Sequence, residues 1–356
     1  MALLQGKIRT AVVGFGISGQ VFHAPLIAAD GHFALNVIVT GDAERQAQAR
    51  QRYPQARLVE NWEQLLQLLD AGDIELDLLV LGTPPQGHRA QAEAAIARGL
   101  HLVIDKPFVP HSRDGEALIA AAQAAGTLLT VFQNRRWDGD FLTVKKLLSQ
   151  GALGDIRSFE SRFEWWRPQG FGNWRDHAAI AQGGGLLLDL GSHLIDQALQ
   201  LFGPVADSYA ELTRHTQPAL SDADEDSFVS LLHVNGVRTR LWMNGLAARQ
   251  GPRFHLLGSQ AGFSKWGLDN QEPALAAGMT PLDTAWGEED PSRWGTLTQD
   301  RQDRIIETER GDYPAFYRLL ANALLEGAPL PVEAADALAT LRLIEDLHTR
   351  YAVRNA

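Results

Sequence analysis

The sequence contains no cysteine, and this absence excludes several kinds of site. A chain without thiols forms no disulfide, offers no sulfur ligand to a metal and has no cysteine nucleophile. No apolar run reaches the roughly 20 residues that a membrane-spanning helix needs. The first residues, Met1 to Lys7, lead directly into a strand pattern and lack the charged and apolar regions of a secretory signal. We therefore expect a cytoplasmic protein that does not act in or on a membrane.

Positive charge is also scarce. The 356 residues include 32 Lys and Arg against 43 Asp and Glu, which gives a formal net charge of -11 without any basic run. Such a field disfavours nucleic acid and anionic lipid as partners. The length predicts about two domains, each with its own core.

Residues 1–132 alternate between apolar strands and helical segments. Ile8 to Val13 is the first strand, and further strands are expected at 35–39, 76–81, 100–104 and 128–132. Strands that are apolar along their whole length indicate a parallel sheet covered by helices on both faces. This pattern predicts an α/β fold with an N-terminal, doubly wound Rossmann domain, whose ligands bind at the carboxyl ends of the strands.

A glycine-rich turn follows the first strand and precedes a helical pattern. In such a turn the glycines let the backbone approach a pyrophosphate, and the amides at the start of the helix donate to it. The position near the N-terminus, between strand and helix, makes this motif a strong indication of a dinucleotide site. The candidate cofactor-binding residues of the turn are Gly14, Gly16, Ile17, Ser18 and Gly19.

The end of the second strand bears on the choice between NAD and NADP. An NAD-binding protein usually carries Asp or Glu about 20 residues beyond the glycine turn, where it binds the ribose 2′-hydroxyl. This chain has Thr40 there, with Asp42 and Arg45 close behind. Without the acid a 2′-phosphate is not repelled, and Arg45 could pair with it. NADP is therefore favoured, although NAD is restored if Asp42 turns its carboxylate inward.

Two more strand ends carry polar residues, Gly82-Thr83-Pro84-Pro85 and Asp105-Lys106-Pro107. Because the carboxyl ends of parallel strands meet at one edge of the sheet, we expect these residues beside the cofactor. The ammonium of Lys106 would then stabilise alkoxide character on a substrate oxygen. The further cofactor-binding candidates are Thr83, Pro84, His88, Asp105 and Lys106.

A second pattern lies at residues 183–196, where three glycines precede an apolar segment carrying Asp189 and His193. Residues four apart share one face of a helix, so the carboxylate can accept a hydrogen bond from one ring nitrogen and leave the other for proton transfer. The same spacing occurs in helix caps and surface pairs, and this stretch alone leaves both interpretations open.

Residues 133–356 lack the strand–helix repeat. Alternating stretches begin at 156–166 and recur up to 257, which indicates an open, antiparallel-rich sheet packed on helices in an α+β domain. Residues 268–301 are predicted to be a long loop, followed by closing helices at 313–325 and 333–351. The outer face of this sheet is a candidate interface for a homodimer or homotetramer.

Tryptophans and arginines gather after the first alternating stretch. Aromatic residues with arginines can bind single-stranded nucleic acid, but the acidic balance favours a sugar-like ligand, with a core or interface role as the alternative. Trp174 is the substrate-binding candidate. The members of this group are Trp165, Trp166, Arg167, Trp174, Arg175 and His177. The acidic cluster at residues 222–226 is interpreted as a solvated turn rather than a cation site.

Taken together, the glycine turn, Asp105-Lys106-Pro107 and the segment with Asp189 and His193 resemble the Gfo/Idh/MocA family of nicotinamide-dependent oxidoreductases. The family usually has Glu-Lys-Pro where this chain has Asp-Lys-Pro. The resemblance implies a Rossmann domain followed by an open-sheet domain that often forms the oligomer interface. It also implies that Lys106, Asp189 and His193 form the catalytic group. Phe22-His23-Ala24-Pro25 and Gln133-Asn134-Arg135-Arg136-Trp137 are similar to the branch with the NADP-dependent scyllo-inositol dehydrogenases.

The resulting hypothesis is reversible hydride transfer between NADP and a secondary alcohol of a polyol or cyclic sugar. His193 would act as general base, Asp189 would orient its ring, and Lys106 would polarise the reacting oxygen, all three in contact with substrate. The alternatives are an aldose or keto-sugar reductase of the same fold and a catalytically idle NAD(P)-binding redox sensor. A metal enzyme using His177, Asp189 and His193 is disfavoured, because the chain has no thiolates and only Asp189 and His193 have the i, i+4 spacing.

Overall fold

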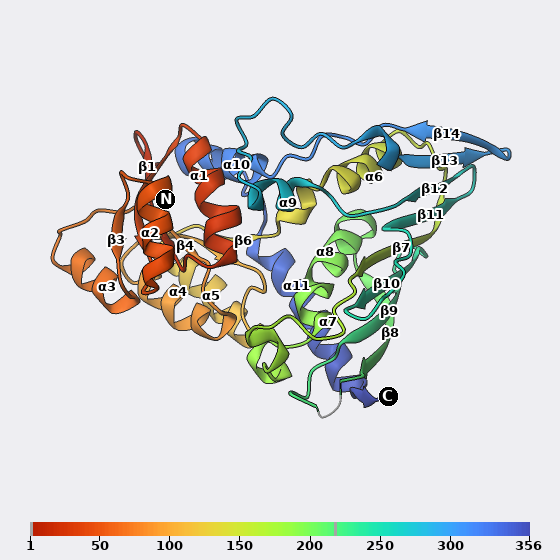
Figure 1. Ribbon diagram of the computed structural model, residues 1–356, viewed down its shortest axis with the longest axis horizontal. Helices are drawn as coiled ribbons and strands as arrows, with labels where there is room; N and C mark the ends of the chain where they lie inside the picture. The colour runs from red at the N-terminus through yellow and green to blue at the C-terminus, as the bar shows by residue number, and fades with distance from the viewer. Residues whose placement is uncertain (1–2, 217–218) are drawn as a thin grey trace.

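The computed structural model describes residues 3–216 and 219–356, except for the side chain of Trp174. Figure 1 shows two sheets separated by helices: a six-stranded sheet built from the first part of the chain and a nine-stranded sheet built from the second. The first sheet is parallel throughout. The predicted fold class, a Rossmann domain followed by an open α+β sheet domain, is therefore confirmed.

The first sheet has the strand order β3-β2-β1-β4-β5-β6. Its strands are β1 (Ile8–Val13), β2 (Phe33–Val39), β3 (Arg57–Val59), β4 (Leu78–Leu81), β5 (His101–Asp105) and β6 (Leu129–Phe132). Its helices are η1 (Ser18–His23), α1 (Ala24–Ala29), α2 (Ala43–Arg52), α3 (Trp62–Asp70), η2 (Pro85–Gly87), α4 (His88–Ile96) and α5 (Ser112–Ala125). The strand order reverses between β1 and β4, which opens a crevice outside the carboxyl ends of these two strands.

The glycine turn fits tightly against the end of β4. Gly14 has a φ of 92°, and a Cβ atom there would lie 2.7 Å from the carbonyl oxygen of Gly82. Only glycine tolerates both the dihedral angle and the contact. The helix after the turn begins as the π-helical η1, and Pro25 lies in the first turn of α1, where a proline needs no intrahelical N–H bond.

The second sheet has the order β14-β13-β12-β11-β7-β10-β9-β8-β15. Its strands are β7 (Ile156–Glu164), β8 (Val205–Arg214), β9 (Asp226–His233), β10 (Arg238–Asn244), β11 (Phe254–Gly258), β12 (Gly262–Lys265), β13 (Gly295–Gln299), β14 (Gln302–Ile306) and β15 (Arg354–Asn355). All neighbours are antiparallel except the pairs β7–β10 and β8–β15. The sheet is therefore mixed, although antiparallel pairing dominates as predicted.

Helices cover one face of this sheet, on the side of the Rossmann domain (Figure 1). The helical elements described after residue 133 are η3 (Asn134–Trp137), α6 (Gly139–Ser149), η4 (Trp174–Asp176), η5 (Ile180–Gln182), α7 (Leu186–Asp189), α8 (Gly191–Phe202), α9 (Gln271–Ala276), η6 (Pro291–Arg293), α10 (Pro314–Glu326) and α11 (Ala334–Arg350). The prediction of one loop over residues 268–301 is wrong, because α9, η6 and β13 lie within it. These elements have three to six residues each, too few to show a period in the sequence.

The closing helix α10 returns to the first sheet. Phe316 and Tyr317 share a core with the strand residues Val12 and Phe132, and the backbone N–H of Leu4 donates to the carbonyl oxygen of Leu324. In Figure 1 this blue helix lies beside the red α1. The domain boundary between residues 132 and 133 stays a prediction. Helix α10, which follows this boundary in the sequence, contributes to the core of the first sheet. No helix in the described ranges is both long and apolar enough to cross a membrane.

We expect Phe316→Ala to lower the free energy of unfolding by about 3–5 kcal/mol, because it empties a ring-filled site. The Phe316 ring is fully buried and lies 4.8 Å from the Phe132 ring, centroid to centroid. Leu319→Ala on the same helix is the control, since Leu319 is 38% exposed and its loss should cost about 0.5 kcal/mol. Urea unfolding compares the two. An equal loss would show that α10 does not stabilise the first sheet.

Candidate active site

A cleft of about 1470 Å³ opens at the carboxyl ends of β1, β2, β4 and β5. It extends from the glycine turn to the side chains of Lys106 and Asp189. Ten of the twelve predicted cofactor-binding residues line this cleft: Gly14, Gly16, Ile17, Ser18, Thr40, Arg45, Thr83, Pro84, Asp105 and Lys106. The topology of the parallel sheet thus brings together residues as far apart in the sequence as Gly14 and Lys106.

The other two, Gly19 and His88, do not face the cleft, and their prediction as cofactor contacts is corrected. A Cβ atom on Gly19 would lie 2.2 Å from the carbonyl oxygen of Gly14, so this glycine permits the turn to close. His88 is fully buried, with Nδ1 at 2.9 Å from the carbonyl oxygen of Phe108 and Nε2 at 2.8 Å from that of Thr83. It ties two strand-end loops together behind the cleft wall.

The cleft has features that fit a dinucleotide. The Oγ atom of Ser18 is buried and has no hydrogen-bond partner among the described residues, although Ser18 lines the cleft. A buried hydroxyl without a partner costs free energy unless a ligand supplies one. Nothing lies closer than 3.8 Å to a Cβ placed on Gly16, so this part of the turn remains open to a pyrophosphate. The residues present therefore fit NAD(P).

At the ribose end, Asp42 is engaged in capping a helix. Its Oδ1 accepts the backbone N–H of Arg45 at 2.9 Å, which makes Asp42 the N-cap of α2. The guanidinium of Arg45 lies over the glycine turn, with Nη1 3.8 Å from a Cβ placed on Gly16. The Arg45 guanidinium thus lies over this end of the cleft, while the Asp42 carboxylate is used in the helix cap; Glu60 also lines the cleft.

Lys106 and Asp189 form an ion pair at the inner end of the cleft. The Nζ atom of Lys106 donates to Oδ1 of Asp189 at 2.8 Å and to its backbone oxygen at 2.9 Å. The Nε atom of Arg175 donates to Oδ2 of the same carboxylate at 3.1 Å. Burial alone would raise the pKa of Asp189, but the charges of Lys106 and Arg175 outweigh it and lower that pKa to about 2. Asp189 is therefore ionised throughout the neutral range.

His193 is close in sequence but does not share this ion pair. The predicted hydrogen bond between Asp189 and His193 is absent, because both carboxylate oxygens are bonded to cations and the helix is interrupted at Leu190 between α7 and α8. Charge-assisted bonds from Lys106 and Arg175 are stronger than one from a neutral imidazole. The Nδ1 atom of His193 is buried without a hydrogen-bond partner in the part of the chain described.

The surroundings of His193 keep its ring neutral. Burial is the main cause that lowers its pKa well below the usual 6.5, and the nearby charges of Lys106, Arg135 and Arg253 lower it further. A neutral ring has one nitrogen with a free lone pair, so it can accept a proton at neutral pH.

A second cavity of about 1130 Å³ adjoins the cleft, and Lys106 and Asp189 line both. His193 lies in its wall together with Trp165 and Arg167. The prediction of an aromatic, arginine-bearing ligand site thus applies to Trp165, whereas Trp166 is 58% exposed and does not line this cavity. The side chain of Trp174 lies outside what the structure describes.

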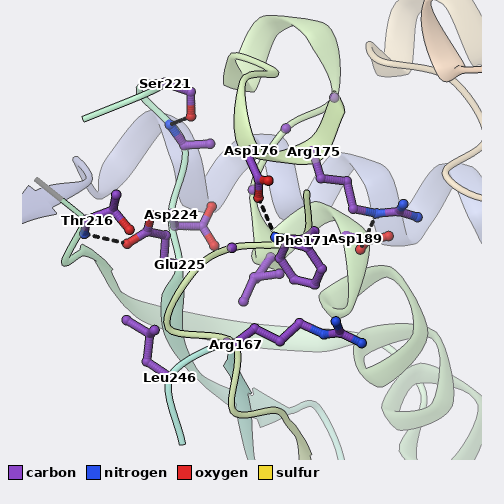
Figure 2. Close-up of a pocket in the computed structure, with 17 residues that line it drawn as sticks. Arg167, Phe171, Arg175, Asp176, Asp189, Thr216, Ser221, Asp224, Glu225 and Leu246 are labelled. Atoms are coloured by element: carbon purple, nitrogen blue, oxygen red, sulfur yellow. Dashed lines mark hydrogen bonds and ion pairs between the residues drawn. The ribbon is translucent and has the colours of Figure 1, made fainter. Parts of the chain in front are cut away.

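One residue of the acidic cluster at residues 222–226 holds the start of the segment with Asp189 in place. Asp224 is buried, and its Oδ2 accepts the backbone N–H of Leu187 at 2.7 Å in the first turn of α7. Figure 2 shows Asp224 and Glu225 on one side of the pocket and Asp189 on the other. The prediction of a solvated turn is therefore wrong for Asp224. The sequence does contain a signal for this role. The N-cap of α7 is Gly185, which has no side chain to accept the first backbone N–H groups, so another residue has to accept them.

Two contributors escaped the sequence analysis. Arg175 was grouped only with the aromatic residues, yet it shares the carboxylate of Asp189 with Lys106. His23 is fully buried, with Nδ1 2.7 Å from the Tyr317 hydroxyl and Nε2 3.9 Å from Oδ2 of Asp105. From the sequence, His23 is named only within the motif Phe22-His23-Ala24-Pro25, without a role at the site. Among residues 3–216 and 219–356, no three His, Asp or Glu side chains are grouped so that they could hold a metal ion.

Comparison with known protein families matches both parts of the chain. Residues 8–133 match the model for the oxidoreductase family with an NAD-binding Rossmann fold. Residues 141–264 match the model for the GFO/IDH/MocA C-terminal domain. Lys106 lies within the first matched segment, and Asp189 and His193 lie within the second.

Curated relatives match over nearly the whole length. The scyllo-inositol 2-dehydrogenase (NADP(+)) IolW of Bacillus subtilis is 35% identical, with 97% of this chain and 95% of the relative covered. The uncharacterized oxidoreductase YdgJ of Escherichia coli is also 35% identical, with 96% of each chain covered.

Solved structures have the same fold. The Bacillus subtilis protein yvaA, assigned as an oxidoreductase, superposes with a TM-score of 0.87 at 33% identity, covering 96% of this chain and 95% of that one. The protein YPO2259 of Yersinia pestis, with the same assignment, has a TM-score of 0.87 at 35% identity, covering 98% and 97%.

The neutral ring of His193 predicts a loss of stability in mild acid. Below about pH 6.5 the unfolded chain protonates this histidine while the folded chain does not. The unfolded state then binds more protons, so the free energy of unfolding decreases as the pH is lowered. His193→Asn should reduce this fall by up to about 1.4 kcal/mol per pH unit. Urea unfolding between pH 5 and 7 measures the slopes. His215→Asn, at an exposed site, is the control, and equal slopes for all three proteins would contradict a neutral, buried His193.

Proposed function

Because the chain belongs to the Gfo/Idh/MocA family of NAD(P)-binding oxidoreductases, we propose that it transfers a hydride reversibly between NADP and a secondary alcohol of a cyclic polyol or sugar resembling scyllo-inositol. The observation that carries this proposal is the placement of Lys106, Asp189 and His193 around the junction of the cleft and the second cavity. A relative with 35% identity bears the name of an NADP-dependent scyllo-inositol 2-dehydrogenase, which supports the class of substrate.

Each member of the group has a distinct part in the proposed reaction. NADP, when bound in the cleft, supplies the hydride acceptor. His193 removes the hydroxyl proton, because its lowered pKa leaves the ring neutral. Lys106 donates to the reacting oxygen and stabilises the negative charge that develops on it. Asp189 remains ionised and holds the ammonium of Lys106 in position, rather than orienting the imidazole as the sequence predicted.

The second cavity suits a ring-shaped polar substrate. Trp165 and Phe171 contribute aromatic faces to its wall, and their rings lie 5.5 Å apart. Aromatic surface with a few polar groups is the usual composition of a small-molecule site. A reductase for another aldose or keto-sugar would use the same catalytic group, so the two proposals differ in substrate and share the chemistry. A cytoplasmic location remains a prediction.

NADP is the proposed cofactor because Arg45 lies over the glycine turn while the carboxylate of Asp42 caps α2. Arg45 is therefore placed to form a charge-assisted pair with a 2′-phosphate. The homologous enzyme named NADP-dependent supports the same choice.

We further propose that the bare face of the nine-stranded sheet packs against a second copy of this chain. Figure 1 shows the helices on the other face only. Large apolar side chains emerge on the bare face; Tyr209, Leu232 and Leu257 are 42–44% exposed. Phe228 and Trp242 stack beside them on neighbouring strands, with centroids 5.1 Å apart. Such a surface favours a homodimer or homotetramer.

The direct test is the absorbance of reduced nicotinamide when the protein meets NADP or NAD with inositols, aldoses and other polyols. We expect a rise with NADP and a cyclic polyol, and a fall in turnover of about 10²- to 10⁴-fold in His193→Asn, because general-base catalysis is lost. His215→Asn serves as the matched control. Wild-type turnover in His193→Asn would contradict its role. Binding of NADPH without turnover of any substrate would favour the idle redox sensor.

Arg45→Gln should weaken NADP binding about 10- to 100-fold and leave NAD binding unchanged, since one charge-assisted contact to the 2′-phosphate is lost. Arg50→Gln, an exposed residue of the same helix, is the control. Fluorescence titration with each reduced cofactor measures both affinities. A parallel loss for NADP and NAD would assign Arg45 to the shared part of the cofactor and remove the basis for the NADP preference.

A further inference from the structure

The wall of the second cavity contains one arginine without a polar partner. Arg167 follows β7 and lines this cavity as well as the neighbouring pocket of Figure 2. Within the described ranges its guanidinium forms no hydrogen bond or ion pair, and its contacts are with two aromatic rings. It lies 5.6 Å from the Trp165 ring centroid and 5.4 Å from that of Phe171.

The other three cations of the cavity are each bound to an acidic side chain. Lys106 and Arg175 both bind Asp189, and Arg135 binds Glu272 at 2.7 Å. Four basic and three acidic side chains line the cavity, while burial keeps the ring of His193 neutral. The cavity therefore has an excess of one positive charge, and within residues 3–216 and 219–356 Arg167 is the one of its four cations that no acidic side chain binds.

Local structure fixes the backbone of Arg167, an exposed residue, at the edge of the cavity. The backbone N–H of Arg167 donates to the carbonyl oxygen of Gly245 at 2.8 Å, and the preceding residue, Trp166, forms a β-bridge with Leu246. Figure 2 shows the side chain of Arg167 running below the ring of Phe171. A guanidinium supported by aromatic faces loses little conformational freedom when it binds a ligand.

The planar fork of an arginine matches the two oxygens of a carboxylate better than a single hydroxyl. From these observations we propose that the substrate is a sugar or polyol carrying a carboxylate, of the uronate or aldonate class, whose carboxylate binds Arg167. A group with a single negative charge matches the excess of one positive charge, whereas a phosphate would exceed it. This proposal rests on the proposed dehydrogenase function, since Lys106 and His193 would then face the reacting carbinol of the same molecule.

The test compares pairs of ligands that differ only in the charged group, on the NADP-saturated protein. Isothermal titration calorimetry measures the affinities for D-glucuronate against D-glucose and for D-galacturonate against D-galactose, with glucose 6-phosphate added to each series. We expect the uronate of at least one pair to bind about 10- to 100-fold more tightly than its neutral partner. Arg167→Gln should lower the uronate affinity to that of the neutral sugar, and Arg167→Lys should retain part of the difference.

Arg249→Gln is the control, because Arg249 is exposed and lines neither cavity, and it should keep the full preference for the uronate. The proposal is overturned if no uronate binds more tightly than its neutral partner, if Arg167→Gln keeps the preference, or if only the phosphate gains affinity. Nicotinamide absorbance is followed with every ligand that binds. Tight, Arg167-dependent binding without hydride transfer would overturn the dehydrogenase proposal and leave the carboxylate site standing.

Discussion

The structure of the site depends on one carboxylate that binds two cations from different parts of the chain. Asp189 lies at the end of α7, Lys106 follows strand β5 of the first sheet, and Arg175 belongs to the segment after β7. The pair is partly buried, with 18% of the Lys106 side chain and 15% of the Asp189 side chain exposed, so removing one partner leaves a charge with less compensation. The ion pair therefore joins the cofactor cleft to the second cavity and couples the placement of the lysine to the folding of both regions.

The same arrangement decides the protonation of His193. In a dyad, a carboxylate bonded to the ring would stabilise the imidazolium, but here the carboxylate is committed to Lys106 and Arg175. What remains around the ring is burial and positive charge from Lys106, Arg135 and Arg253, and both disfavour a proton on it. A base with such a lowered pKa is available throughout the neutral range, although it holds its proton weakly. In the proposed reaction, the negative charge that forms on the substrate oxygen would then be stabilised chiefly by Lys106.

Much of the fold was predictable because its signals are local. The glycine turn and the apolar strands specify a parallel sheet, and the rule that ligands bind at strand ends places Thr83 and Lys106 at one cleft. What the sequence could not show is which partner a polar side chain chooses. The spacing of Asp189 and His193 indicates a pair, but the cations that take the carboxylate come from residues 14 and 83 positions away. His88 was similarly misplaced, because its buried bonds to two carbonyl oxygens depend on how two loops meet.

The three glycines before Asp189 allow close contacts that determine where the helix carrying Asp189 begins. Gly183 lines the cleft. Gly184 and Gly185 have a different constraint: a Cβ atom on Gly184 would lie 1.9 Å from the carbonyl oxygen of Ala178, and one on Gly185 would lie 2.3 Å from Oδ1 of Asp224. Their bare backbone lets Asp224 reach the N–H of Leu187 and fix the first turn of α7. Asp189 is the last residue of that helix, so its carboxylate is positioned by Gly184, Gly185 and the buried Asp224. The carboxylate in turn positions the ammonium of Lys106.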